Sequence, residues 1–350
     1  MTVRPGVILA AFIAVAAAMG IVVSLIQRPP PSHPVPRITP ASVGPTPVPR
    51  QPSVAFAFSV ADDASTGEVV LFGGVSNVAN TWAWNGATWT LLHPANSPKG
   101  RYAASAAFDP QSGQILLFGG HLQSGAPVND TWGWDGTNWE RLSAGGAGEP
   151  PAGGGSQMAW DPALNQMLLV TLSAPGGGGG QTWIWTGTHW LRQSAGMLGV
   201  IDSSILLAYD PISRTMLAEG CCAAQAANLV TEPASTWRWD GSKWHVVTGV
   251  NSPSDSTAIA LDPNRGSLVL CNCDLVGGVV PALWTWDGSR WLPLATDRVP
   301  PQPQAEVTDV TRSQLLLLGF AFSEAQSIAQ PVQTWELSGS AWRLLDAGPE

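Results

Sequence analysis

The chain has 350 residues, of which 45% are hydrophobic and 12% are charged. Such a composition excludes a disordered chain and predicts a large folded core. The net charge is -9, and the 16 Lys and Arg residues are scattered along the sequence, which argues against nucleic-acid binding. The 38 Gly and 30 Pro residues suit an all-β protein rich in turns, a linker, or both.

The N-terminal region predicts a membrane anchor. After a short tail, residues 1–5, the segment 6–26 carries no charged side chain. As a helix it is long enough to cross a hydrocarbon core of about 30 Å, which predicts one transmembrane helix. A cleaved signal peptide is the alternative, because the small residues of 14–18 resemble a cleavage site, although the apolar run continues beyond them. The short tail and the cysteines described below predict a single-pass protein of the cell membrane, with its bulk on the extracytoplasmic side.

Residues 27–52 predict a stiff linker. Ten prolines lie between Pro29 and Pro52, a density that excludes helix and favours extended polyproline II, which rises about 3.1 Å per residue. The linker would hold a folded domain away from the bilayer. A proline-rich ligand for a partner domain is the alternative.

From residue 53 onward the chain is a repeat of the pattern Trp-x-Trp-Asp-Gly-x-x-Trp. Counted from the first Trp of each copy, the spacings are 50, 51, 54, 47 and 51 residues. Seventeen of the 18 Trp residues belong to this pattern: Trp82, Trp84, Trp89, Trp132, Trp134, Trp139, Trp183, Trp185, Trp190, Trp237, Trp239, Trp244, Trp284, Trp286, Trp291, Trp335 and Trp342. The first two Trp of a copy are two residues apart and share one face of a strand, so we expect them to fill the core. Platforms that bind sugars are the alternative.

Each repeat predicts four short antiparallel strands separated by turns. The first turn carries an Asp, usually followed by Pro, in every copy: Asp63, Asp109, Asp161, Asp210, Asp262 and Asp309. Asp and Pro specify a tight turn, which we favour over the alternative of metal sites, and we expect no metal. The Asn-Gly or Asp-Gly pair of the pattern predicts the hairpin between the third and fourth strands.

The pattern and its period resemble those of kelch-type β-propellers, in particular Trp-rich kelch-like repeat proteins and the central domain of galactose oxidase. The resemblance covers residues 53–350 and implies an all-β, six-bladed β-propeller of four-stranded antiparallel blades. The predicted blades are, in order, about 53–99, 100–151, 152–200, 201–252, 253–303 and 304–350. The double glycine that ends the second strand is intact only at Gly73-Gly74 and Gly119-Gly120. We further expect the ring to close without a strand exchanged between the first and last blades.

The four cysteines are expected at one end of the propeller. Cys221 and Cys222 end the second strand of blade four, and Cys271 and Cys273 lie at the matching place in blade five. Disulfides between the two blades are the first interpretation, because pairing within either Cys pair would strain the bridge. Free thiols and a thiolate metal site are the alternatives.

Function is expected at the same end, where the longer and less regular loops lie: 121–129, 173–181, 222–235, 274–282 and 321–333. The polar candidates for ligand binding are Arg101, His121, Glu219, Glu232 and Asp274. No catalytic residue and no cofactor is assigned. The sequence favours a module that binds a protein or a glycan through this face. The alternative is a carbohydrate-active enzyme of the mutarotase or oxidase kind, although a galactose-oxidase copper site is doubtful with only two Tyr residues.

Overall fold

The structure is a computed structural model that describes residues 51–54, 56–75, 79–172, 180–193, 204–221, 235–248, 252–253, 256–272, 282–297, 300, 303–320 and 330–346. The predicted transmembrane segment and nearly all of the linker lie outside these residues. Within them there is no helix that is long and apolar enough to span a membrane.

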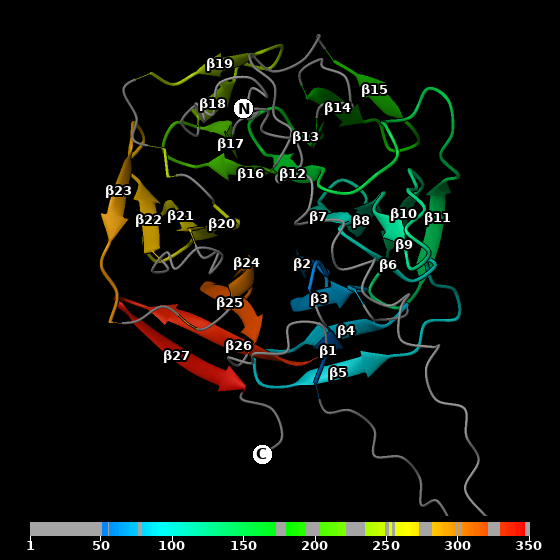
Figure 1. Ribbon diagram of the computed structural model, residues 1–350, viewed down its shortest axis with the longest axis horizontal. Coiled ribbons are helices and arrows are strands. Elements are labelled where there is room, and N and C mark those ends of the chain that lie inside the picture. The colour runs from blue at the N-terminus through cyan, green and yellow to red at the C-terminus, as the bar shows by residue number, and fades with distance from the viewer. Residues whose placement is uncertain are drawn as a thin grey trace, which may run out of the picture. The chain divides into compact units, whose positions relative to one another are not determined.

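Residues from Val48 onward form one compact unit, in which six blades of four antiparallel strands surround a common axis, with a fifth strand added to the sheet of blade six (Figure 1). The all-β, six-bladed fold is therefore confirmed. Blades one to three consist of β2 (Ser59–Asp63), β3 (Glu68–Phe72), β4 (Thr81–Trp84) and β5 (Trp89–Leu92); β7 (Ser105–Asp109), β8 (Gln114–Phe118), β10 (Thr131–Trp134) and β11 (Trp139–Ser143); and β12 (Gln157–Asp161), β13 (Gln166–Thr171), β14 (Gln181–Trp185) and β15 (Trp190–Arg192).

Blades four to six consist of β16 (Ser204–Asp210), β17 (Thr215–Cys221), β18 (Ser235–Trp239) and β19 (Trp244–Val246); β20 (Ala258–Asp262), β21 (Ser267–Asn272), β22 (Ala282–Trp286) and β23 (Trp291–Leu294); and β24 (Pro303–Asp309), β25 (Gln314–Phe320), β26 (Gln330–Ser338) and β27 (Ala341–Asp346). In every blade the first strand lies nearest the axis and the fourth lies on the rim (Figure 1). The two tight turns of a blade lie at one end, the turn end, and the remaining connections lie at the other, the loop end.

The first-turn aspartates hold the turn end together. Each of the six is at most 3% exposed and accepts a hydrogen bond from a backbone N–H of its own turn. Asp63, for example, accepts from the N–H groups of Ser65 and Thr66. This is the behaviour expected of Asp in a tight turn. Among the described residues, no three His, Cys, Asp or Glu side chains are placed to hold a metal ion.

The Trp pattern fills the space between blades. All of its members are buried or half-buried, and in blade two the rings of Trp134 and Trp139 are 5.3 Å apart between centroids. The fourth-strand Trp also makes a hydrogen bond that the sequence did not predict. Its Nε1 donates to the Thr that directly precedes the first Trp in the third strand of the preceding blade. These bonds join Trp89 to Thr334, Trp139 to Thr81, Trp190 to Thr131, Trp244 to Thr182 and Trp291 to Thr236, over 2.8 to 3.0 Å. We call this bond the Thr–Trp latch.

The way the ring closes corrects the expectation that no strand is exchanged between the first and last blades. The C-terminal strand β27 stays in blade six, but a two-residue strand, β1 (Ser53–Val54), pairs with β26 of the same blade. Val332 also donates its N–H to the Pro52 carbonyl over 2.9 Å. The residues after the linker therefore extend blade six, and blade one begins only at Ser59. Phe58, between the two, packs in a cluster shared by blades one and six.

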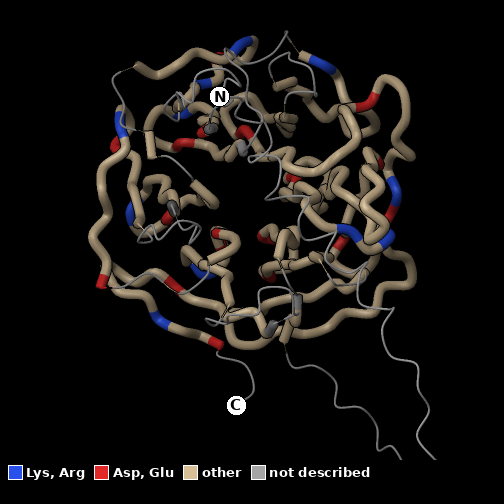
Figure 2. The backbone as a smooth tube through the Cα atoms, viewed as in Figure 1, with Lys and Arg blue, Asp and Glu red and all other residues tan. Residues whose placement is uncertain are grey.

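Within the described part of the chain, the Lys and Arg residues do not gather in one place. Figure 2 shows Lys and Arg residues distributed around the rim of the described propeller. Cys271 is fully buried in β21. The side chains of the other three cysteines lie outside the described residues, so the pairing between blades four and five stays a prediction.

Candidate functional site at the loop end

The loop end is described most fully in blades one and two, where an additional small sheet lies. β6 (Arg101–Tyr102) pairs with β9 (His121–Leu122), with Tyr102 opposite His121. The double glycines make this possible. Gly73 and Gly120 both have positive φ, and a Cβ on Gly73 would lie 2.3 Å from the Arg101 carbonyl oxygen. Only glycine allows the two backbones to approach this closely.

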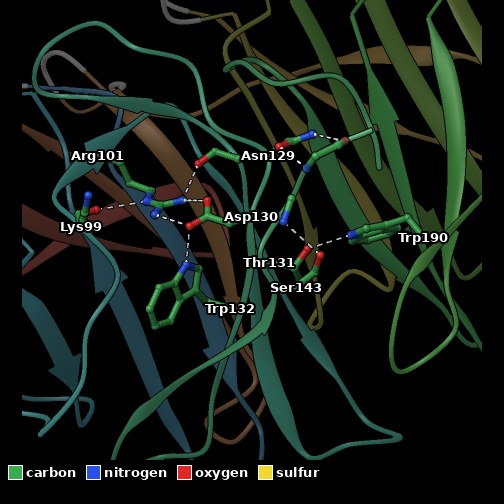
Figure 3. A network of polar contacts seen from close by, with 11 residues as sticks. Lys99, Arg101, Asn129, Asp130, Thr131, Trp132, Ser143 and Trp190 are labelled. Atoms are coloured by element: carbon green, nitrogen blue, oxygen red, sulfur yellow. Dashed lines mark hydrogen bonds and ion pairs between the residues drawn. The ribbon is translucent and has the colours of Figure 1, made fainter. Parts of the chain in front are cut away.

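Arg101 anchors the site from inside. It is 1% exposed, and its Nη1 and Nη2 donate to the two carboxylate oxygens of Asp130 over 2.6 and 3.0 Å (Figure 3). Nη1 also donates to the Gly119 carbonyl, and Nε donates to the Lys99 carbonyl. The guanidinium group is thus engaged on both edges, so it positions the surrounding backbone. A direct contact with a ligand would require it to leave these partners.

Asp130 completes this anchor. Its Oδ2 accepts a second hydrogen bond from Trp132 Nε1 over 2.7 Å (Figure 3). Partial burial raises the pKa of Asp130, but the hydrogen bonds and charge of Arg101 outweigh burial and hold that pKa below its ordinary value. The carboxylate is therefore ionised at neutral pH, and the pair is a true ion pair.

Two aromatic rings stack in the small sheet formed by β6 and β9. The Tyr102 and His121 rings are 5.4 Å apart between centroids and inclined by 19°, and both side chains are half-buried. His121 Nδ1 is buried and has no hydrogen-bond partner. Gly154 packs beside it, because a Cβ there would meet His121 Nδ1 at 2.9 Å. Tyr102 follows Arg101 directly in β6, and Gly154, which precedes β12, lies against His121 Nδ1.

A third aromatic residue, Phe56, lies on a neighbouring backbone segment. Phe56 is 40% exposed, and its carbonyl accepts a hydrogen bond from the Val75 N–H, while the next carbonyl, that of Ala57, accepts from the Ala103 N–H. Phe56 is thus held on a backbone directly beside that of Tyr102. We call Phe56, Tyr102 and His121 the aromatic shelf. At its rim Gln123 is exposed and donates from Nε2 to the Gly74 carbonyl.

Glu219 lies elsewhere, between blades four and five. It is 2% exposed, and its Oε2 accepts a hydrogen bond from Thr236 Oγ1 over 2.6 Å, while Oε1 is buried without a partner. Burial raises the pKa of Glu219 to about 8, against the opposing hydrogen bonds from Thr236, Trp291 and Ser252. Its position in β17 corresponds to Phe72 in β3, whose ring packs on a Trp of the next blade. Glu219 therefore substitutes for a core residue.

The structure thus brings Arg101 and His121 together and separates Glu219 from them. Glu232 and Asp274 lie outside the described residues. Sequence reasoning missed Phe56, Tyr102 and Asp130. Tyr102 had a signal, because it follows Arg101 at the start of blade two and is one of only two Tyr residues. No sequence signal indicated Phe56, because its exposure depends on the pairing of β1.

Comparisons with known proteins support the fold. No protein-family model matches the chain, and no curated protein sequence matches it. Among solved structures, the SapL1 lectin in complex with alpha methyl fucoside has a TM-score of 0.56 at 13% identity, over 85% of this chain and 97% of the lectin. The six-bladed Aleuria aurantia lectin, a fungal protein with a fucose recognition mode, has a TM-score of 0.55 at 13% identity, over 86% and 99%. YjhT has a TM-score of 0.54 at 13% identity, over 85% and 98%. These similarities establish a six-bladed propeller, whereas the kelch-type identity stays a prediction.

Proposed function

We propose that this protein is a carbohydrate-binding propeller that acts through its loop end, with the aromatic shelf as its ligand contact. The observation that carries the proposal is the stacked, half-buried pair of Tyr102 and His121 beside the exposed Phe56. The C–H faces of a sugar ring pack on aromatic rings, and neighbouring polar groups then fix its orientation. The similarity to fucose-binding lectin propellers supports the same class of ligand.

The geometry favours binding over catalysis. Arg101 is enclosed and paired with Asp130, and Glu219 faces Thr236 in the interior between blades. An enzyme on this scaffold would need an acid or base beside the ligand, and the aromatic shelf offers His121 alone for that task. Among the described residues, no specific observation favours the mutarotase-like or oxidase-like alternative.

Binding is tested with the full-length chain in detergent on a panel of immobilised neutral and acidic saccharides. Substituting Tyr102→Ala or Phe56→Ala should weaken binding about tenfold or more, which corresponds to roughly 1.4 kcal/mol. Tyr102→Phe keeps the ring and should retain most of the affinity. Leu191→Ala, which alters a 48% exposed side chain on the rim strand β15, is the matched control. Unchanged binding in the Ala variants would exclude the aromatic shelf, and binding to no saccharide would exclude the ligand class.

The same proposal includes the anchor. We place the propeller outside the cytoplasm, held at the cell membrane by residues 6–26 and spaced from it by the linker. An intact N-terminus on the mature protein, recovery in the membrane fraction after alkaline washing, and digestion of the propeller by protease added to whole cells should all be observed. A mature N-terminus near residue 18 would instead indicate a cleaved signal peptide.

A further inference from the structure

One of the six blade junctions lacks the Thr–Trp latch. Between blades five and six, the Thr position is occupied by Leu283, and Trp342 Nε1 is buried without a hydrogen-bond partner. Both residues belong to the apolar cluster that joins these two blades. An unpaired buried N–H is costly, so this junction lacks the interior polar bond present at the other five. Other hydrogen bonds still cross it, among them Thr308 Oγ1 to the Leu261 carbonyl over 2.7 Å and the Asp297 N–H to the Ser340 carbonyl over 3.0 Å.

The same junction contains a second unpaired group. Glu306 in β24 is 8% exposed, and both of its carboxylate oxygens are buried without a partner. It lies opposite Leu317 of β25, and residues directly opposite one another share a face of the sheet. Leu317 belongs to the cluster shared with blade five, so Glu306 faces blade five. The equivalent positions of the other first strands are all apolar: Val60, Ala106, Met158, Leu207 and Ile259.

Among the residues that the structure describes, no cation compensates this carboxyl. Burial raises the pKa of Glu306 well above the ordinary value of 4.5, and burial is the only cause. The charged groups on the first strands that pack against β24, and on β24 itself, are acidic residues near the turn end: Asp262 of β20, Asp62 and Asp63 of β2, and Asp309. β25 carries no charged residue. An ionised carboxylate without a partner is strongly disfavoured in such surroundings, so Glu306 is neutral while the junction is closed.

We propose that the junction between blades five and six is a pH-controlled seam, closed while Glu306 keeps its proton and opening locally when the carboxyl loses it. The raised pKa is that of Glu306 in the closed form. The free energy by which protonated Glu306 favours the closed form is therefore fully present below about pH 4.5, and it is lost as the pH rises toward the closed-form pKa. Within that window the ratio of open to closed forms should increase by up to about tenfold per pH unit.

The test is hydrogen exchange of the full-length chain between pH 5 and 9, with rates corrected for the intrinsic effect of pH. Peptides that cover β20 and β24 should lose protection as pH rises, whereas peptides that cover β7 and β12, at the junction of blades two and three, should not. Glu306→Gln, which cannot ionise, should remove this pH dependence.

Two further variants keep the test decisive. Glu306→Leu introduces the side chain that blade four has at Leu207, so it should fold and keep the seam closed at every pH. Glu219→Gln alters the buried carboxyl between blades four and five and should leave the response of β24 unchanged. The proposal is overturned if Glu306→Gln or Glu306→Leu retains the wild-type pH response, or if β7 and β12 lose protection in parallel with β24.

Discussion

Thr131→Val removes the acceptor of one Thr–Trp latch while keeping the shape of the side chain. In the native protein Trp190 Nε1 donates to Thr131 Oγ1 over 2.9 Å, and both residues are at most 3% exposed. Valine offers no oxygen and leaves the indole N–H in an apolar junction where water does not replace the bond. We therefore expect the variant to fold with a weaker contact between blades two and three.

The expected cost follows from the burial of the donor. Leaving a buried N–H unsatisfied costs about 1–3 kcal/mol, more than the roughly 1 kcal/mol net contribution of an average hydrogen bond. Thr131→Ser keeps the hydroxyl and loses one methyl group, worth about 0.8 kcal/mol. If the hydroxyl provides the stabilisation, Thr131→Val should therefore be the less stable of the two variants, although it retains more apolar volume.

Urea unfolding followed by Trp fluorescence measures both variants. A second comparison uses the junction without a latch: Trp190→Phe breaks a hydrogen bond, whereas Trp342→Phe removes an N–H that has no partner. Both indoles are at most 4% exposed, so the loss of apolar area is similar, and Trp190→Phe should cost about 1 kcal/mol more. Equal free energies of unfolding for Thr131→Val and Thr131→Ser would refute the latch.

Three other outcomes are expected. Gly288→Ala should destabilise the fold by roughly 1 kcal/mol more than Gly187→Ala. The two glycines have similar φ angles, 95° and 93°, so the backbone strain is matched. Only at Gly288 would a Cβ clash, at 2.7 Å, with Ile212 of the preceding blade. Burial raises the pKa of Glu219 to about 8, so the melting temperature of the wild-type protein should fall as pH rises from about 4.5 to 8. Glu219→Gln should flatten this dependence of melting temperature on pH, and an unchanged slope in that variant would contradict the prediction. Mass spectrometry of the protein under non-reducing conditions should find bridged cysteines, and four free thiols would reject the predicted pairing between blades four and five.

The repeat could be predicted because its causes are local. An Asp in the first turn and an Asn-Gly or Asp-Gly pair in the second each fix a backbone geometry within four residues, so they can be recognised in a single sequence. The structure adds a second reason for those glycines. A Cβ on Gly136 would meet Thr66, and a Cβ on Gly288 would meet Ile212, each from the preceding blade. The Asn-Gly or Asp-Gly pair therefore forms its own hairpin turn, and its glycine also leaves room for the first turn of the preceding blade.

The features that the sequence did not predict depend on contacts between distant segments. The β1 strand consists of two residues whose backbone pairs with Gln330 and Pro331, and so short a pairing leaves no periodic pattern. Arg101 was identified as a polar candidate, but its burial depends on Asp130, 29 residues further along the chain. A composition-based argument can select such residues, yet it cannot tell whether they face a ligand or each other.

The departures from the repeat are informative because the repeat itself is so regular. At five junctions a Thr receives the Trp hydrogen bond, and at the sixth Leu283 replaces it. At five positions of the first strand an apolar side chain packs between blades, and at the sixth Glu306 replaces it. Both departures fall on one junction, and both leave a buried polar group without a partner. Glu219 is a third departure, at the junction of blades four and five, but that junction keeps the latch from Trp291 to Thr236, and Thr236 also donates to Glu219. The junction of blades five and six differs in combining a missing latch with a carboxyl that has no partner on either oxygen, which favours a local opening there.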